Sequence, residues 1–270
     1  MHIETLVSTM NKKNKEDIIK MLEKMNIQTD AIVINQNSNK ENIIKTEMSD
    51  RKIKIINKKN KGLSKSRNEL LEVCDGDIGI IADDDLRYLN QYESIIKEAY
   101  NRNKDADVIC FKVYKGEKPL KRYSEKKNKV GFFRSLQKSS VEITYKIESI
   151  KKNSIKFDEN FGSGSEKYIS GEENIFLADC LRKKLKIIYE PVFIARLNDK
   201  KDSSWFKGYN EQYFKTKGAA FYRINPKISL MLIIIFATRK KYMYKKEISF
   251  FKAIKFMYNG RKECKERKVE

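Results

Sequence analysis

The chain has 270 residues, 40% hydrophobic and 35% charged, which is typical of a globular protein with a strongly charged surface. Lys and Arg total 58 against 37 Asp and Glu, and the net charge of +21 favours anionic partners such as phosphates, nucleic acid or an acidic membrane face. The single histidine, His2, argues against Ser-His-Asp and Cys-His catalysis and against histidine-rich zinc sites. Proton transfer and metal binding must therefore fall mainly to carboxylates.

The pattern of cysteines and apolar runs favours a cytoplasmic location. The cysteines are far apart, without C-x-x-C spacing, as expected for reduced thiols: Cys74, Cys110, Cys180 and Cys264. Residues Met1–Met10 lack the basic and apolar regions of a secretory signal. The longest apolar run, Leu230–Ala237, is too short to span a bilayer. We expect a cytoplasmic protein with peripheral contact at the inner face of the plasma membrane.

The first third of the chain alternates short apolar runs with helical patterns. We predict strands at Ile3–Ser8, Ala31–Asn35, Lys52–Ile56 and Ile78–Ala82, and helices at Lys15–Met25 and Leu63–Val73. This order is typical of βαβ units with a parallel sheet covered on both faces.

The rhythm continues after this region and then loosens. A helix at Gln91–Asn103 and a strand at Asp107–Tyr114 precede a basic, exposed loop at Lys115–Lys129. Further on we predict strands at Val141–Ile147, Lys186–Glu190 and Val192–Arg196, and helices at Glu148–Ser154 and Glu172–Lys184. Pro191 would stand at an edge or kink.

The last part of the chain differs in composition. From Arg239 onward it carries twelve Lys or Arg and four Glu, a net charge of +8. Ser249–Tyr258 places one apolar face beside lysines, its members being Phe250, Ala253, Ile254 and Met257. This pattern fits an interfacial helix on an anionic membrane, and it fits a helix packed on the domain almost as well.

Three consecutive aspartates, Asp83, Asp84 and Asp85, follow the predicted strand Ile78–Ala82. Ligands of parallel α/β sheets bind beyond the carboxyl ends of the strands. A divalent cation would relieve the repulsion between the carboxylates, and the side chains of Asp83 and Asp85 point the same way in extended backbone. The alternative is an acidic turn that caps a helix beginning near Leu89.

The segment Asn60–Asn68 has the features of an anion-binding helix start. Gly62 supplies a flexible turn and Ser64 a candidate N-cap, while Lys65 and Arg67 bring positive charge near the helix N-terminus.

Together these segments carry a family resemblance. N-x-G-L-S-x-S-R-N, followed by G-D-I-x-x-x-x-D-D-D, resembles the nucleotide-sugar half of family 2 glycosyltransferases. The resemblance implies a GT-A fold, which is an α/β Rossmann-like architecture with a mostly parallel central sheet flanked by helices, here with a helical C-terminal extension. It implies that Asp83 and Asp84 contact the donor, with Asp83 at the nucleoside or ribose, and that Asp85, with Asp83, binds Mg²⁺ or Mn²⁺ at the diphosphate. Arg67 and the Gly62 loop would lie against the nucleotide.

The resemblance extends to the first two strands. Val7–Asn11 stands where the family reads I-P-T-Y-N, which places Thr9 and Asn11 in the donor-binding loop. At the second strand, Asn35 and Gln36 stand where many members have acidic residues. An amide there still hydrogen-bonds a pyrimidine edge or a ribose.

A second motif, Ser170–Phe176, resembles the G-E-D-x-x-F segment of the family, and K-I-x-Y-x-P follows it at Lys186–Pro191. The resemblance maps the general base to Glu173, with Glu172 in support or exchanging with it. The alternative is that both glutamates only complement the helix dipole. A carboxylate base suits the chemistry, because a sugar hydroxyl attacks poorly unless its proton is removed.

The chain lacks the C-terminal histidine that many GT-A enzymes add. Arg196, Lys200 or Lys201 would neutralise the diphosphate instead, and Asp202–Trp205 would line the site. Nearby aromatic residues fit either stacking on sugar rings or packing in a helix: Trp205, Phe206, Tyr209, Tyr213 and Phe214.

The residues and the resemblance together predict a metal-dependent glycosyltransferase of hexosyltransferase type, and the resemblance implies that it is inverting. Its catalytic domain would span residues 1–200, with a nucleotide-sugar half (1–115) and an acceptor half (116–200), before a basic helical extension (201–270). The expected donor is a UDP-sugar, and the expected acceptor is a saccharide linked to a lipid such as polyprenyl diphosphate, in cell-surface polysaccharide synthesis at an anionic membrane. The alternative is a non-catalytic basic nucleic-acid-binding protein on a Rossmann-like scaffold; the glycosyltransferase interpretation involves no nucleic acid.

Overall fold

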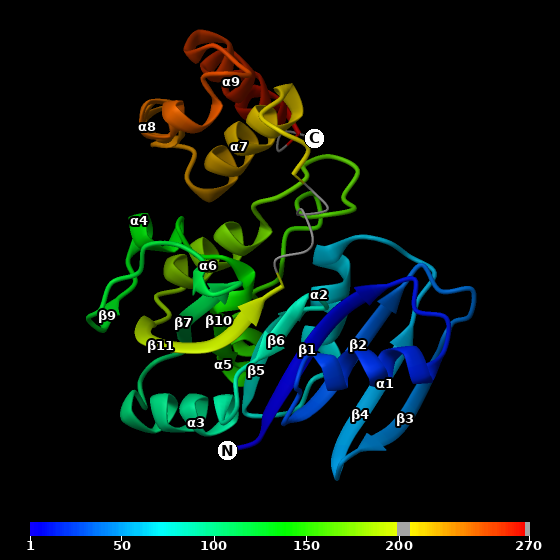
Figure 1. The fold of residues 1–270 in the computed structure, drawn as a ribbon. Coiled ribbons are helices and arrows are strands. Elements are labelled where there is room, and N and C mark those ends of the chain that lie inside the picture. The colour runs from blue at the N-terminus through cyan, green and yellow to red at the C-terminus, as the bar shows by residue number, and fades with distance from the viewer. Residues whose placement is uncertain (199–205, 268–270) are drawn as a thin grey trace. The chain divides into compact units, whose positions relative to one another are not determined.

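The computed structural model describes residues 1–198 and 206–267, and the chain divides into two compact units. The sheet unit comprises Met1–Lys61, Lys65–Lys156 and Leu177–Lys201. The helical unit comprises Gly62–Ser64, Phe157–Phe176 and Asp202–Glu270. The mixed α/β class with C-terminal helices is confirmed (Figure 1).

The strands all belong to the sheet unit. In chain order they are β1 (Ile3–Met10), β2 (Asp30–Gln36), β3 (Asn42–Met48), β4 (Arg51–Asn57), β5 (Ile78–Asp83), β6 (Leu86–Tyr88), β7 (Val108–Lys115), β8 (Lys118–Pro119), β9 (Asn128–Lys129), β10 (Ile143–Lys146) and β11 (Ile187–Leu197). The described helices are α1 (Lys15–Lys24), α2 (Leu63–Val73), α3 (Tyr92–Arg102), α4 (Phe132–Ser135), α5 (Ile147–Lys152), α6 (Glu172–Arg182), α7 (Glu211–Ile224), α8 (Ser229–Tyr244) and α9 (Phe250–Glu266), with a 3₁₀ turn at Ser140–Glu142.

The sheet has the strand order β3-β4-β2-β1-β5-β10-β7-β11-β6. The strands β4, β2, β1 and β5 pair in parallel, with β1 between β2 and β5, and β7 and β11 form a second parallel pair. The first four of these strands lie beside one another in the blue to cyan part of Figure 1. Their apolar runs form the core because both faces of the strands are covered. The predicted parallel sheet is confirmed, and β10 interrupts it with antiparallel pairs to β5 and β7.

Five strands differ from the prediction. The short strands β6, β8 and β9 were not predicted, and β8 and β9 lie within the segment expected to be a loop, Lys115–Lys129. The strand β3 lies at the sheet edge, antiparallel to β4, and its alternating, mostly exposed residues lack the continuous apolar run of a buried strand. The two strands predicted around Pro191 form the single strand β11. Its pairing with β7 shifts register between Tyr189 and Phe193, and this irregularity accommodates a residue that has no N–H to donate.

The helical unit has an apolar core of its own. Its buried residues come from α7, α8 and α9: Tyr213, Phe214, Ile233, Ala237, Tyr244, Ala253 and Met257. The apolar face predicted within Ser249–Tyr258 lies partly in this core, since Ala253 and Met257 are fully buried. Packing, one of the two interpretations of that face, is what the structure shows.

The aromatic residues near the start of α7 also pack together. The ring of Tyr209 lies 5.1 Å from Phe206 and 5.2 Å from Tyr213, and Phe214 lies 5.1 Å from Tyr244. The packed-helix interpretation therefore holds for these residues, while Trp205 lies outside the described residues.

The helices α7 and α9 approach each other at glycines. A Cβ added to Gly218 would lie 1.7 Å from the carbonyl oxygen of Met257, and one added to Gly260 would lie 1.9 Å from that of Lys215. Only glycine allows the two backbones to come so close.

We predict that Gly218→Ala lowers the free energy of unfolding by about 1–3 kcal/mol, because the methyl group forces α7 and α9 apart. Urea denaturation followed by circular dichroism measures this change. Gly131→Ala is the control, since no atom lies within 4 Å of its added Cβ, and we expect a change below about 0.5 kcal/mol there. Equal stability of the two variants would contradict the close contact.

Candidate active site

The register of the parallel strands gathers polar residues at the carboxyl edge of the sheet. Ser8 on β1 lies opposite Ile34 on one side and Asp83 on the other. One position further, Thr9 lies opposite Asn35, which in turn lies opposite Asn57. The strands thus bring together five predicted donor-binding residues at one edge: Thr9, Asn11, Asn35, Gln36 and Asp83.

Asp83 is held by a buried arginine. Nη2 of Arg67 donates to Oδ1 of Asp83 at 2.9 Å, and the Arg67 side chain is only 3% exposed against 31% for Asp83. The neighbouring Ser66 hydroxyl donates to Ser8 at 2.9 Å, which ties α2 to β1. The hydroxyl of Ser140 lies 3.3 Å from the second Asp83 oxygen. The orientation of Asp83 is therefore fixed from both oxygens.

Asp84 is held by the end of β1 and by the loop that follows it. The Thr9 hydroxyl donates to Oδ2 of Asp84 at 2.7 Å, and Nζ of Lys12 lies 3.3 Å from the same oxygen. Lys12 was not among the predicted site residues, because a single lysine in so basic a chain carries no pattern. Its position directly after the Val7–Asn11 motif is the signal that would have identified it.

The aspartates do not cap a helix. The next helix, α3, begins at Tyr92 with Gln91 as its N-cap, and β6 lies between it and Asp85. The interpretation of these residues as an acidic helix cap is therefore wrong.

Asp85 is the aspartate that the sequence analysis assigns to the metal. It is half-buried, and its atom Oδ1 is buried, while its carbonyl oxygen accepts a hydrogen bond from the Asn198 N–H at 3.2 Å. Carboxylate oxygens are the ligands that Mg²⁺ and Mn²⁺ prefer. In the part of the chain that the structure describes, these aspartates do not form a complete three-ligand cluster, so a cation here requires further oxygens from a bound ligand.

The amides at the end of β2 are engaged with neighbouring loops. Asn35 exchanges hydrogen bonds with the Lys12 backbone at 2.9 and 3.0 Å and donates to Asn57 at 2.8 Å. Gln36 donates to Asn60 at 3.3 Å, and its carbonyl oxygen accepts the Asn11 N–H at 3.0 Å. These hydrogen bonds connect the end of β2 to the loop after β1 and to the end of β4 and the loop that follows it.

A pocket of about 530 Å³ borders this edge on the side of α1. Asp84 and Asn198 line it together with a set of cationic side chains: Lys12, Lys13, Lys20 and Lys24. Such a lining favours an anionic occupant.

The predicted Gly62 loop belongs to the helical unit. Gly62 has a φ of +121°, and the Leu63 N–H donates to the Ser163 carbonyl at 2.9 Å. Ser64 lies inside α2 and donates to the Phe161 carbonyl at 2.5 Å, so its interpretation as an N-cap is wrong.

Glu172 and Glu173 begin α6 in the helical unit, directly after Gly171, whose φ of +104° suits glycine. Glu172 is 5% exposed and its carboxyl carbon lies against the Gly162 turn, 3.3 Å from where a Cβ would be. Glu173 is only half-buried. Of the two carboxylates, Glu173 is the one with access to solvent.

A lysine on α7 faces these glutamates. The Ile169 N–H donates to Thr216 at 3.3 Å, and a Cβ on Gly171 would lie 3.3 Å from Cβ of Ala220, so this face of α7 packs against the segment before α6. In the sequence of α7, Lys217 stands between Thr216 and Ala220, the two residues that make these contacts. Burial lowers the pKa of its ammonium group, and the charges of Glu173 and then Glu172 oppose that effect. Lys217 and the two glutamates are brought together only by the tertiary fold, and no sequence motif predicts that they are close.

The predicted diphosphate contacts are described in part. Arg196 on β11 forms an ion pair with Glu117 and lies 5.3 Å from the ring centre of Tyr114. Lys200, Lys201 and the segment Asp202–Trp205 lie outside the described residues.

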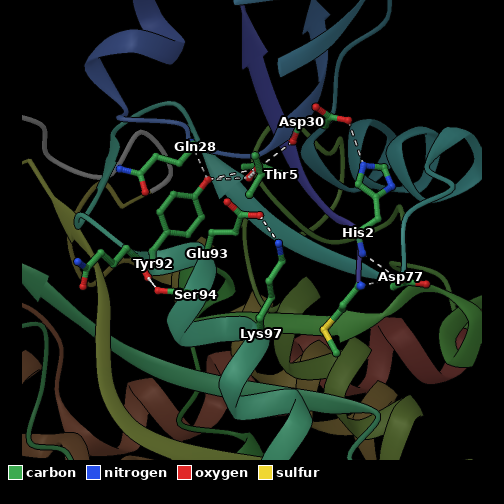
Figure 2. A network of polar contacts seen from close by, with 12 residues as sticks. His2, Thr5, Gln28, Asp30, Asp77, Tyr92, Glu93, Ser94 and Lys97 are labelled. Carbon is green, nitrogen blue, oxygen red and sulfur yellow. Dashed lines mark hydrogen bonds and ion pairs between the residues drawn. The ribbon is translucent and has the colours of Figure 1, made fainter. Parts of the chain in front are cut away.

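The single histidine lies at the other end of β1. His2 Nε2 is 3.0 Å from Asp30 Oδ2, and its backbone N–H donates to Asp77 at 2.7 Å (Figure 2). The hydroxyl of Tyr92 accepts from the Gln28 N–H at 3.1 Å beside it. Since β1 and β5 are parallel, His2 and the three aspartates occupy opposite edges of the sheet. His2 ties strand ends together and leaves the candidate site to carboxylates.

Comparisons with known proteins agree with this fold. The chain is similar to the crystal structure of S. aureus TarS 1-349 in complex with UDP-GlcNAc, with a TM-score of 0.65 and 15% identity over 92% of this chain and 74% of that one. The complex of TarS 1-349 with UDP gives a TM-score of 0.59 and 16% identity over the same shares. A longer S. aureus TarS structure gives 0.61 and 15%, over 91% of this chain and 44% of that one. No curated protein matches in sequence.

The fold is therefore that of a GT-A glycosyltransferase, as predicted. The model of the family "Glycosyl transferase family 2" matches residues 6–164, which is more than half of the chain. The chain belongs to this family, and none of the comparisons supports the nucleic-acid-binding alternative.

We predict that Arg67→Met lowers the free energy of unfolding by about 2 kcal/mol, less than the 3–5 kcal/mol of a fully buried pair because Asp83 is partly exposed. Chemical denaturation measures this loss. The control is Lys97→Met, which removes a helical pair with Glu93 whose side chains are 40% and 32% exposed, and it is expected to cost below about 0.5 kcal/mol. A loss no larger than that of the control would show that the Arg67–Asp83 pair does not stabilise the edge.

Proposed function

We propose that the protein is an inverting, metal-dependent glycosyltransferase that moves a sugar from a UDP-sugar to a hydroxyl of a saccharide acceptor. The observation that carries this proposal is the row of aspartates at the carboxyl edge, with Asp83 oriented by Arg67 and Asp84 by Thr9. Membership in glycosyl transferase family 2 supports the class of reaction, and the TarS complexes with UDP-GlcNAc and UDP support the class of donor.

On the donor side, the fixed polar groups recognise the nucleotide. Asp83, Thr9, Asn11 and the amides of Asn35 and Gln36 hydrogen-bond the nucleoside, with Gly62 and Arg67 beside it. Asp85, assisted by Asp83, would hold Mg²⁺ or Mn²⁺, which supplies charge neutralisation for the leaving diphosphate. Lys12, 3.3 Å from Asp84, adds a cation to the predicted Arg196 and Lys200.

On the acceptor side, Glu173 removes the proton from the attacking hydroxyl, and the hydroxyl oxygen displaces the diphosphate at the anomeric carbon in one step. Its half-buried position supports this role over that of Glu172, whose carboxylate packs against the Gly162 turn. A side-chain base of this kind contributes about 10²–10⁴-fold to a rate.

The proposed setting is cell-surface polysaccharide synthesis with a lipid-linked acceptor at an anionic membrane. The cationic surface supports it, since net positive charge draws a protein to acidic lipids. No helix among the described residues has the length and hydropathy required to cross a bilayer, so the membrane contact proposed here is peripheral.

The test is UDP release from UDP-sugars with Mn²⁺ and a saccharide acceptor. We predict that Glu173→Gln and Asp85→Ala each lower turnover at least about 10²-fold without unfolding the protein, and that EDTA abolishes release. Glu148→Gln, a change of an exposed first-turn glutamate on α5, is the matched control and keeps full turnover. Near-normal turnover of Glu173→Gln would reject it as the base, and absence of release with every nucleotide sugar would reject the function.

We further propose that the ammonium group of Lys217 holds the carboxylate of Glu173 in place. Burial lowers the pKa of this ammonium group, so it loses its charge at a lower pH than an exposed lysine does. Lys217→Met should therefore lower turnover at about pH 7, and the difference from wild type should shrink as the pH rises. Lys217→Arg keeps the charge and should retain turnover over this range. The control is Lys215→Met on the same helix, because Lys215 pairs instead with Glu211 and Glu263. Parallel pH profiles for wild type and Lys217→Met would refute this role.

A further inference from the structure

The helix α8 exposes large apolar side chains along one face. At about 100° per residue, six exposed uncharged positions between residues 230 and 242 fall within an arc of about 140°, which also contains Lys241, while the exposed Met243 lies outside it. The members of this α8 face are Leu230, Met231, Ile234, Ile235, Thr238 and Tyr242. Ile234 is 50% exposed and Tyr242 is 70% exposed. Contiguous apolar patches of this kind on a soluble domain usually mark an interaction surface.

The opposite side of the same helix explains why this face is left outward. Leu232, Ile233 and Ala237 are buried, and Ile233 and Ala237 belong to the core of the helical unit. The helix is therefore apolar nearly all round, although a helix on a folded domain needs only one apolar face to pack. The outward face is not required for the fold.

The charges around the α8 face indicate its partner. The helix contains no acidic residue, and exposed cations gather in its C-terminal part and directly after it: Arg239, Lys240, Lys241, Lys245 and Lys246. On α9 the outward positions alternate between aromatic rings and lysines, as Phe251, Lys255, Tyr258 and Lys262. Apolar and aromatic side chains flanked by lysines suit the interface of an anionic bilayer.

We infer that the α8 face inserts into the surface of an anionic membrane, with the lysines after it on the lipid headgroups. This inference deepens the membrane part of the proposed function. It moves the contact from the predicted face within Ser249–Tyr258, where Ala253 and Met257 are buried, to the preceding helix.

The test is flotation of the full-length protein with vesicles of phosphatidylcholine alone or with phosphatidylglycerol. Wild type should float with the anionic vesicles only. Leu230→Glu with Ile234→Glu should lower the partition coefficient at least about tenfold, because two inserted side chains become carboxylates facing anionic lipid. The control pair is Ile43→Glu with Phe133→Glu, which replaces side chains of the sheet unit that are 61% and 56% exposed and adds the same charge.

Three outcomes would overturn the inference. Wild type that does not float, or floats equally with neutral vesicles, contradicts the anionic partner. A double variant at Leu230 and Ile234 that floats like wild type contradicts the location. If wild type does not float but forms a dimer, and the double variant is monomeric, the α8 face would instead be an interface with a second copy of the chain. Flotation requires no nucleotide sugar, and UDP release is measured separately with a soluble acceptor, so failure of this inference is distinguishable from failure of the proposed function.

Discussion

The parallel hydrogen bonding of β1 to both β2 and β5 is the constraint on which the candidate site depends. It aligns the carboxyl ends of the strands, so that short polar sequences separated by many residues become neighbours at one edge. Local hydrogen bonds and ion pairs then orient the side chains at this edge. Arg67 orients Asp83. Thr9 at the end of β1 and Lys12 in the loop after it orient Asp84.

The edge also illustrates how charge is managed in a cationic protein. Two aspartates of the row pair with cations from different elements. Asp83 pairs with Arg67 on α2, and Asp84 pairs with Lys12 in the loop after β1. Repulsion between adjacent carboxylates is thereby reduced before any ligand arrives. Asp85, whose atom Oδ1 is buried, is the carboxylate that the proposed function assigns to the metal ion.

How much the sequence could predict depended on whether a feature is local. Continuous apolar runs identified the central strands, and the helix Leu63–Val73 was predicted with both of its ends. The strand β3 escaped because an edge strand exposes most of its residues. Lys12 and Lys217 were not predicted, because only the tertiary fold brings Lys12 close to Asp84 and Lys217 close to Glu172 and Glu173. The apolar face within Ser249–Tyr258 allowed two interpretations, since a buried and a lipid-facing stripe have the same spacing.

The division of the chain into units has a consequence for how this protein is dissected. The helical unit takes its residues from the C-terminal part and also from Gly62–Ser64 and Phe157–Phe176. Removing everything after residue 201 would strip these internal segments of their packing partners, including the contacts of Ile169 with Thr216 and of Asp158 with Arg223. The boundary between the units is thus not a place to cut the gene. Chimaeras with relatives would have to exchange three stretches of sequence together.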